Sequence, residues 1–209
     1  MKLTVFGGTG RTGQLVVEQA LAAGHEVIVL ARNPEKVAIQ HPALEIVQGD
    51  VQDAAAVERA LSGADAVISV LGPTSNEPVF AVSRGMQHIL AVMQRQGTRR
   101  LVISAGAGVG DPQDAPGLFN HLMNFLLKTV AKNVYLDMQK TVDLVRASTL
   151  DWTVVRVPML VDGSQTGSVK AGYVGKGMGP RITRADMAAF LLRQVEENGY
   201  VRQSPAISN

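Results

Sequence analysis

The sequence predicts a single α/β domain, in which a doubly wound parallel sheet carries helices on both faces. Short apolar runs rich in Val, Ile and Leu alternate along the chain with segments of helical spacing. Because these runs do not alternate apolar with polar residues, we expect strands buried on both faces, as in parallel sheets. No repeat or linker divides the 209 residues, and this length suits one domain.

Each expected element has a local signal. The strands are expected at residues 2–6, 25–32, 44–50, 64–72, 99–108 and 151–158, and the helices at 12–24, 54–63, 77–97 and 132–147. Glycines close the first three of these helices, at Gly24, Gly63 and Gly97. A last helix is expected to follow Thr183, because Thr183 and Asp186 have the T-x-x-D spacing of an N-terminal cap.

The composition argues against several classes of function. Hydrophobic residues make up 46% of the chain and charged residues 18%, so we expect a folded globule. The net charge is +2, without a dense Lys/Arg tract, so neither nucleic acid nor a membrane is an expected partner. The chain has no cysteine, which excludes disulfides and thiolate chemistry. The histidines, at positions 25, 41, 88 and 121, show no ligand spacing, so no metal site is expected.

The N-terminal segment MKLTVFGG leaves no room for the apolar core of a signal peptide before the first expected strand. No apolar stretch approaches the ~18 residues needed to cross a bilayer. We therefore expect a cytoplasmic protein.

The stretch VFGGTGRTGQ, residues 5–14, contains four glycines directly after the first expected strand. Glycine in a regular element costs roughly 0.5–1 kcal/mol relative to alanine, so the cluster needs a compensating reason. The glycines satisfy both G-x-x-G-x-x-G and G-x-G-x-x-G between a strand and a helix, where a Rossmann-type fold binds the pyrophosphate of a dinucleotide. The alternative is a glycine-rich turn that binds nothing. The residues expected to contact the cofactor here are Gly7, Gly8, Thr9, Gly10, Arg11, Thr12 and Gly13.

The end of the second expected strand indicates which dinucleotide would bind. NAD sites usually place an Asp or Glu there to hold the ribose 2′-hydroxyl, whereas this strand ends in VLARNP, with Arg32 at that position. Arg11 lies in the glycine turn and can reach the same region. Two guanidinium groups suit a 2′-phosphate, so we expect NADP(H) rather than NAD(H). The alternative is that both are ordinary surface arginines.

Four segments carry a resemblance to a known family: FGGTGRTG, ARNPEK, GDVQD and ASTLDWTVVRVPMLVDG. Together they resemble the atypical short-chain dehydrogenase/reductase superfamily, and within it the NAD(P)H-binding group of flavin reductase/biliverdin-IXβ reductase and NmrA-like proteins. The resemblance runs nearly end to end. It implies that Asp50 and Val51 flank the adenine, that Leu71, Gly72 and Ser104 line the cofactor, and that Pro158 and Met159 lie near the nicotinamide.

The expected active site departs from the pattern of that superfamily, whose typical members use Tyr-x-x-x-Lys. Here Tyr135 is followed by Gln139 at +4, and Lys140 comes only at +5. On a helix +4 lies about 40° round the axis but +5 about 140°, so the two side chains would face differently. Flavin/biliverdin-type pockets carry a serine and a histidine, whereas this chain has Met159 at the second position and either Ser104 or Gly106 at the first. The catalytic residues are therefore left open, with Ser104, Tyr135 and Lys140 as candidates.

Residues 105–130 and 159–180 are expected to form the substrate side. The apolar segment 117–130 is a lid, part of the core or a subunit contact, and the glycine-rich segment 163–180 is a short hairpin or a loop. Two functions stay open. One is an NADPH-dependent reductase of a planar conjugated acceptor such as a flavin, quinone or tetrapyrrole; the other is a non-catalytic NmrA-like dinucleotide-binding regulator or assembly factor. We expect a small-molecule acceptor as partner, and a monomer or small homo-oligomer.

Overall fold

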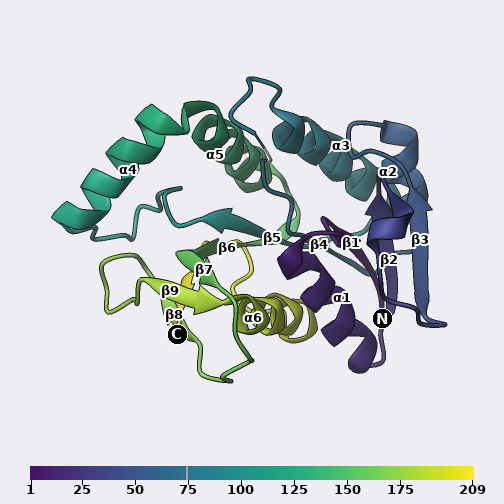
Figure 1. Cartoon of the computed structure of the whole chain (residues 1–209). Coiled ribbons are helices and arrows are strands. Elements are labelled where there is room, and N and C mark those ends of the chain that lie inside the picture. The colour runs from purple at the N-terminus through teal and green to yellow at the C-terminus, as the bar shows by residue number, and fades with distance from the viewer. Residues whose placement is uncertain (74) are drawn as a thin grey trace.

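The computed structural model describes residues 1–73 and 75–209, and side chains are described outside 119–124. Its centre is an eight-stranded sheet in the order β3-β2-β1-β4-β5-β6-β10-β8 (Figure 1). All neighbouring strands are parallel except β10 and β8, which pair antiparallel. The strands are β1 (Lys2–Phe6), β2 (Glu26–Ala31), β3 (Leu44–Gln48), β4 (Ala66–Ser69), β5 (Arg100–Gly106), β6 (Asp151–Val157), β8 (Lys170–Gly172) and β10 (Ala206–Ser208). The expected doubly wound parallel sheet is confirmed.

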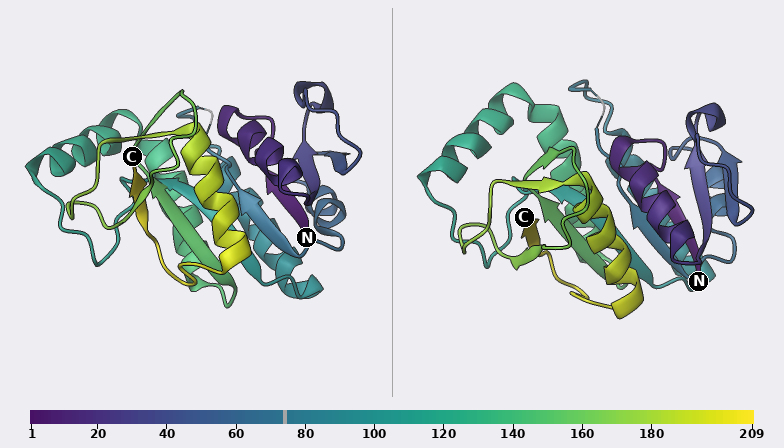
Figure 2. Two further views of the ribbon diagram at one scale, coloured as in Figure 1. Left: turned by 90° about the horizontal axis from the view of Figure 1, so that it is seen from below. Right: turned by 60° about the horizontal axis from the view of Figure 1, so that its bottom comes forward.

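Helices cover both faces of this sheet. On one face lie α1 (Arg11–Ala22) and α6 (Arg184–Glu197), side by side in Figure 2, and their apolar residues form one core with β1, β2 and β6. On the other face lie α2 (Ala54–Leu61), α3 (Ala81–Gln96) and α5 (Lys132–Ala147), which form the second core. Helix α4 (Leu118–Val130) contacts α5 and extends away from the sheet (Figure 1).

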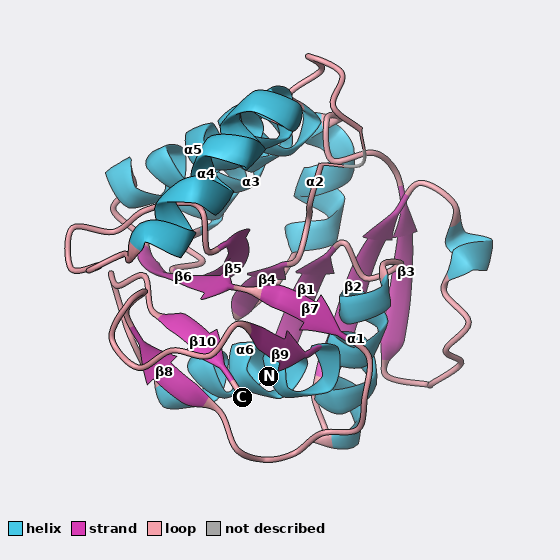
Figure 3. Cartoon of the chain, turned by 60° about the vertical axis from the view of Figure 1, so that its left-hand side comes forward, coloured by secondary structure: helices cyan, strands magenta, loops and turns pink. Residues whose placement is uncertain are grey.

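Three short elements complete the chain: the 3₁₀ turn η1 (Pro34–Lys36) and the strands β7 (Met159–Val161) and β9 (Arg181–Thr183). Strands β7 and β9 form a separate two-stranded parallel ribbon on the same side of the main sheet as α1 and α6 (Figure 3). The capping signal at the start of α6 is confirmed, because the Thr183 hydroxyl accepts a hydrogen bond from the Asp186 amide at 3.1 Å.

One expectation about the sheet was wrong. Strand β3 is not buried on both faces, and most of its side chains are exposed. The reason is that β3 is an edge strand, with a neighbouring strand on one side only. Of the two alternatives for segment 163–180, the loop is the one that the structure favours. The segment contributes only the short strand β8, whose partner is β10. Among the described residues, the helices are too short or too polar to cross a membrane.

Candidate functional site

The glycine turn lies where the strand order reverses. The chain leaves β1 toward β2 and β3 on one side and returns to β4, β5 and β6 on the other. In open α/β sheets, ligands bind outside the carboxyl ends of the strands at such a switch point. Gly7 begins the turn with φ +85°, and a Cβ there would lie 3.0 Å from the carbonyl carbon and oxygen of Val70, just after β4. The turn is therefore wedged against the end of β4.

Two further glycines are required by packing within the protein. A Cβ on Gly13 would lie 2.0 Å from the Gly7 carbonyl oxygen, and a Cβ on Gly8 would lie 2.8 Å from Cγ1 of Val29. The Gly7 carbonyl is backbone, and the Val29 side chain is fully buried in the core, so neither can easily move aside. These glycines therefore allow α1 to approach β1 and β2 closely.

Gly10 is different, because little in the protein requires a glycine there. It is exposed, it has φ −80°, and the nearest heavy atom to a Cβ would be the Gly7 carbonyl oxygen at 3.3 Å, which a shift of a few tenths of an ångström relieves. Gly10 is also the N-cap of α1 and has no side chain to bond the helix amides. The Gln14 amide is the first that bonds back along the helix, to the Gly10 carbonyl at 2.9 Å.

The amides of residues 11–13 thus stand at the open, positive end of α1, beside a backbone that carries no Cβ. This is the arrangement that binds a phosphate. The residues of the turn therefore fit the pyrophosphate of a dinucleotide.

Arg32 and Asp50 lie at the ends of two neighbouring strands. Arg32 follows β2 directly, and its Nε is 4.0 Å from Oδ2 of Asp50, which comes two residues after β3. The Arg32 side chain is 70% exposed, so its guanidinium group remains accessible to a ligand. Asp50 also accepts a hydrogen bond from the Gln52 amide at 2.9 Å, and the Val51 side chain packs against the backbone of Gly85 in α3. Both residues expected to flank the adenine are thereby held in place.

Arg11 does not point toward Arg32. Its guanidinium group forms a salt bridge with Asp162, directly after β7, and Arg184 at the start of α6 donates to the same carboxylate at 2.7 Å. Arg11 and Asp162 are each about two-thirds exposed, so their pair contributes little to stability and can open easily. Arg32 alone of the two arginines is free for a 2′-phosphate in this arrangement.

The other residues implied by the resemblance lie at the carboxyl ends of adjacent strands. Leu71 and Gly72 follow β4, Ser104 lies two residues before the end of β5, and Pro158 and Met159 follow β6. Leu71 and Ser104 are half-buried, and Met159 is 63% exposed. A Cβ on Gly72 would meet no atom within 4 Å, so its surroundings are open. The structure thus brings these residues to the same edge of the sheet as the glycine turn.

Tyr135 and Lys140 lie on one continuous helix, α5. The Tyr135 hydroxyl donates to Oε1 of Gln139 at 3.4 Å, whereas Lys140 is exposed. The ammonium nearest to the Tyr135 ring among the described contacts is that of Lys128, 5.2 Å from the ring centroid. As expected from the sequence, Tyr135 and Lys140 therefore face different sides of α5, and among the described contacts the Tyr135 hydroxyl bonds Gln139 and not Lys140.

Two buried carboxylates near this edge make contacts that the sequence did not predict. Buried Asp137 caps α3 by accepting from the amides of Val82 and Ser83, at 3.1 and 2.9 Å. Buried Asp186 accepts from Thr166 and Gly167 as well as from Thr183. Burial alone would raise the pKa of Asp186, but the hydrogen bonds from Thr183, Thr166 and Gly167 outweigh it and lower the pKa to about 2.

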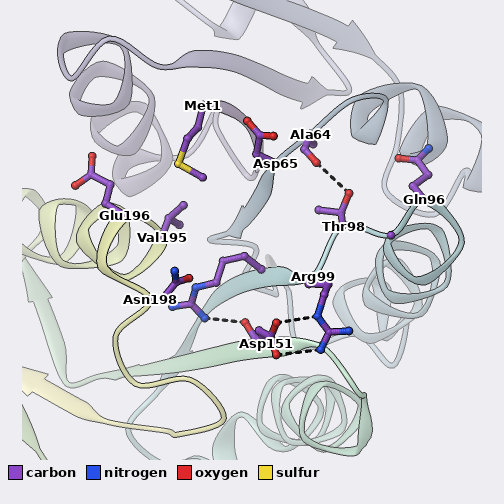
Figure 4. Close-up of a pocket in the computed structure, with 12 residues that line it drawn as sticks. Met1, Ala64, Asp65, Gln96, Thr98, Arg99, Asp151, Val195, Glu196 and Asn198 are labelled. Atoms are coloured by element: carbon purple, nitrogen blue, oxygen red, sulfur yellow. Dashed lines mark hydrogen bonds and ion pairs between the residues drawn. The ribbon is translucent and has the colours of Figure 1, made fainter.

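A cavity of about 670 Å³ lies elsewhere, at the amino ends of the strands (Figure 4). Its charged side chains are already paired: Arg99 donates to both carboxylate oxygens of Asp151, at 2.9 and 3.1 Å. Burial lowers the pKa of Arg100 to about 10, against the opposing charge of Asp151, and its guanidinium group bonds backbone carbonyls. Among the described residues, no group of three or more His, Asp or Glu could hold a metal ion.

Comparisons with known proteins show the fold and the family of this chain. The chain is 28% identical to a (4-alkanoyl-5-oxo-2,5-dihydrofuran-3-yl)methyl phosphate reductase of Streptomyces griseus, over 99% of this chain and 67% of that protein. Its fold resembles a short-chain dehydrogenase/reductase of Veillonella parvula solved with NADP (TM-score 0.81, 16% identity, 100% of this chain and 94% of that chain). It also resembles ChuY, an anaerobillin reductase of Escherichia coli O157:H7 (TM-score 0.78, 19% identity, 100% and 97%). A model of the NAD(P)H-binding family matches residues 7–198, and the chain belongs to this family.

Proposed function

We propose that this protein is an NADPH-dependent reductase that delivers a hydride to a planar conjugated acceptor, such as a flavin, a quinone or a tetrapyrrole. The observation that carries the proposal is the open end of α1, where Gly10 leaves room beside amides that bond no other group within the helix. When bound, NADPH supplies the hydride. The residues of this chain bind the phosphates, orient the nicotinamide and keep the acceptor against it.

The preference for NADPH over NADH rests on Arg32. A carboxylate at the end of β2 would accept from a ribose 2′-hydroxyl, whereas Arg32 offers an exposed guanidinium group there. This group can donate charge-assisted hydrogen bonds to a 2′-phosphate. Arg11 joins it only if the salt bridge to Asp162 opens.

The acceptor would lie against Pro158 and Met159 at the end of β6. Exposed Met159 offers a polarizable apolar contact for a flat ring. Reduction of a conjugated ring system asks the protein chiefly for position and a dry surface, and such proximity effects contribute about 7–11 kcal/mol. The proton would come from water or from a nearby hydroxyl such as that of Ser104. Two of the similar proteins, the enzyme from Streptomyces griseus and ChuY, are described as reductases, which supports this class of reaction.

A non-catalytic NmrA-like regulator is the second candidate. It is favoured by one observation: the Tyr135 hydroxyl bonds Gln139, and among the described contacts Lys140 does not lie beside it. Such a protein would bind the dinucleotide at the same turn and reduce nothing.

The test is NADPH oxidation by the purified protein, followed by absorbance, against a panel of flavins, quinones and biliverdins. We expect the wild type to reduce at least one acceptor of the panel and the Gly10→Val variant to reduce none. Tight NADPH binding without oxidation in the whole panel would support the regulator instead.

A further inference from the structure

Arg156 is a buried charge in the last part of β6. It is fully buried, two residues before Pro158, and it faces the same side of the sheet as α5. Its guanidinium group donates to the backbone carbonyls of Ser204 and Val109, at 2.8 and 3.2 Å. It also donates to both carboxylate oxygens of Asp114, at 2.5 and 2.8 Å. A bidentate pair of this kind fixes orientation as well as distance.

Asp114 belongs to the segment 107–117, which connects β5 to α4. Besides Arg156, its carboxylate accepts from the amides of Asp111 and Val174, both at 2.9 Å. Burial would raise the pKa of Asp114, but the hydrogen bonds from Arg156 and Asp111, the Arg156 charge and the Val174 amide together lower it. The carboxylate is therefore charged and contacts three parts of the chain at once.

The third of these parts is the segment 173–177, which follows β8. Its backbone meets the first segment directly, because the Ala115 amide donates to the Val174 carbonyl at 2.9 Å. A Cβ on Gly175, where φ is +82°, would lie 1.8 Å from the Ala115 carbonyl oxygen. We call Asp114, Ala115, Arg156, Val174 and Gly175 the joint between the two segments.

A second arginine holds the same connecting segment without reaching the joint. Arg146 of α5 donates to the Gly110 carbonyl at 3.1 Å and to Oδ2 of Asp111 at 3.2 Å. Its contacts also include the Ser204 hydroxyl at 2.9 Å, but they do not extend to residues 173–177 in the described chain. Asp111 therefore provides a matched control for Asp114: both are carboxylates of one segment paired with a buried or partly buried arginine.

We propose that the Arg156–Asp114 pair is a positioning device, which locks segments 107–117 and 173–177 into a single wall on the acceptor side of the site. This inference rests on the proposed function, since it assigns the wall to the acceptor and not to the dinucleotide. Arg156 reaches this wall from β6, the strand that Pro158 and Met159 directly follow, so the pair fixes the distance between the wall and these two residues. In the described part of the chain, no hydrogen bond or ion pair joins the glycine turn to the joint, so we expect dinucleotide affinity not to depend on the joint.

The test compares Asp114→Asn and Asp111→Asn with the wild type. For Asp114→Asn we expect at least tenfold faster amide hydrogen exchange in both segments. The KM for the acceptor should rise at least tenfold, while kcat and the Kd for NADPH stay within about threefold. For Asp111→Asn, faster exchange should be confined to residues 109–114. A pair that only stabilises the fold would lower the melting temperature and leave the KM unchanged.

Gly175→Ala provides a second variant that leaves both charges in place, should Asp114→Asn fail to fold. Its methyl group would press on the Ala115 carbonyl and part the two segments, so the KM for the acceptor should rise in the same way. An unchanged exchange rate in residues 173–177, or an unchanged KM with faster exchange, overturns the proposal. A wild type that reduces no acceptor removes the acceptor role together with the proposed function, while the exchange rates still decide whether the joint couples the segments.

Discussion

Replacing Arg32 by aspartate should reverse the choice of cofactor. The Arg32 side chain is 70% exposed and its contact with Asp50 spans 4.0 Å, so the pair contributes at most about 1 kcal/mol to stability. The fold should therefore survive the change. Charged hydrogen bonds are worth about 1.5–3 kcal/mol, so losing them from a 2′-phosphate predicts NADPH binding weaker by about 10- to 140-fold.

The new carboxylate would repel the 2′-phosphate but accept a hydrogen bond from a 2′-hydroxyl, so NADH binding should tighten or stay level. Calorimetric titration with both dinucleotides measures this. Arg95→Asp is the matched control, because Arg95 is also exposed and forms a weak pair, 3.5 Å from Glu58, but lies at the far end of α3. Equal affinities of the wild type for NADPH and NADH, or equal losses in Arg32→Asp and Arg95→Asp, would refute the reasoning.

Three further predictions address the glycine turn, Tyr135 and the buried carboxylate of Asp186. Gly10→Val should abolish dinucleotide binding and leave the circular dichroism spectrum unchanged. The protein has room for a side chain at this position, but that side chain would occupy the space of the pyrophosphate. Retained binding would mean that the glycine serves the fold alone. Tyr135→Phe should change turnover only a few-fold, since its hydroxyl bonds Gln139 and lacks Lys140; a loss of a hundredfold or more would make Tyr135 a general acid. The Asp186 pKa of about 2 lies below its unfolded value, so its contribution of about 2 kcal/mol is present above pH 4 and lost as the pH falls toward 2. Urea unfolding should therefore show Asp186→Asn less stable than the wild type at pH 7 by about this amount, with the difference shrinking by pH 2; a pH-independent difference would contradict the assignment.

The parts of the fold with strong local signals were predictable from the sequence. The helix at 132–147 and the strand at 2–6 have the expected bounds, because the helix repeats apolar residues at helical spacing, as at Met138, Val142 and Val145, and the strand is a short apolar run. The three-residue strands β8 and β10 were missed, since they are too short to show a period and depend on pairing with each other. Exposure of β3 also follows from its place in the sheet and not from its own residues.

The candidate site divides in the same way. The glycine turn was found because its spacing is local and its geometry follows from the flanking strand and helix. The partners of Arg11 and Arg156 were not, because Asp162 and Asp114 lie 151 and 42 residues away in the chain. One signal was available: an arginine within the apolar strand WTVVRVP must be buried and therefore needs a counter-charge.

The central claim is that the protein passes a hydride from NADPH to an acceptor at this edge of the sheet. The most direct measurement uses NADPH deuterated at either the 4R or the 4S position of the nicotinamide, with mass spectrometry of the NADP+ that forms in the presence of the acceptor panel. The label is followed in the dinucleotide because deuterium on a nitrogen or oxygen of the acceptor exchanges with water. With the wild type we expect NADP+ that has lost deuterium from one face and kept it from the other, and with Gly10→Val no NADP+. NADPH that stays bound and unoxidised with every acceptor would contradict a reductase and leave the regulator.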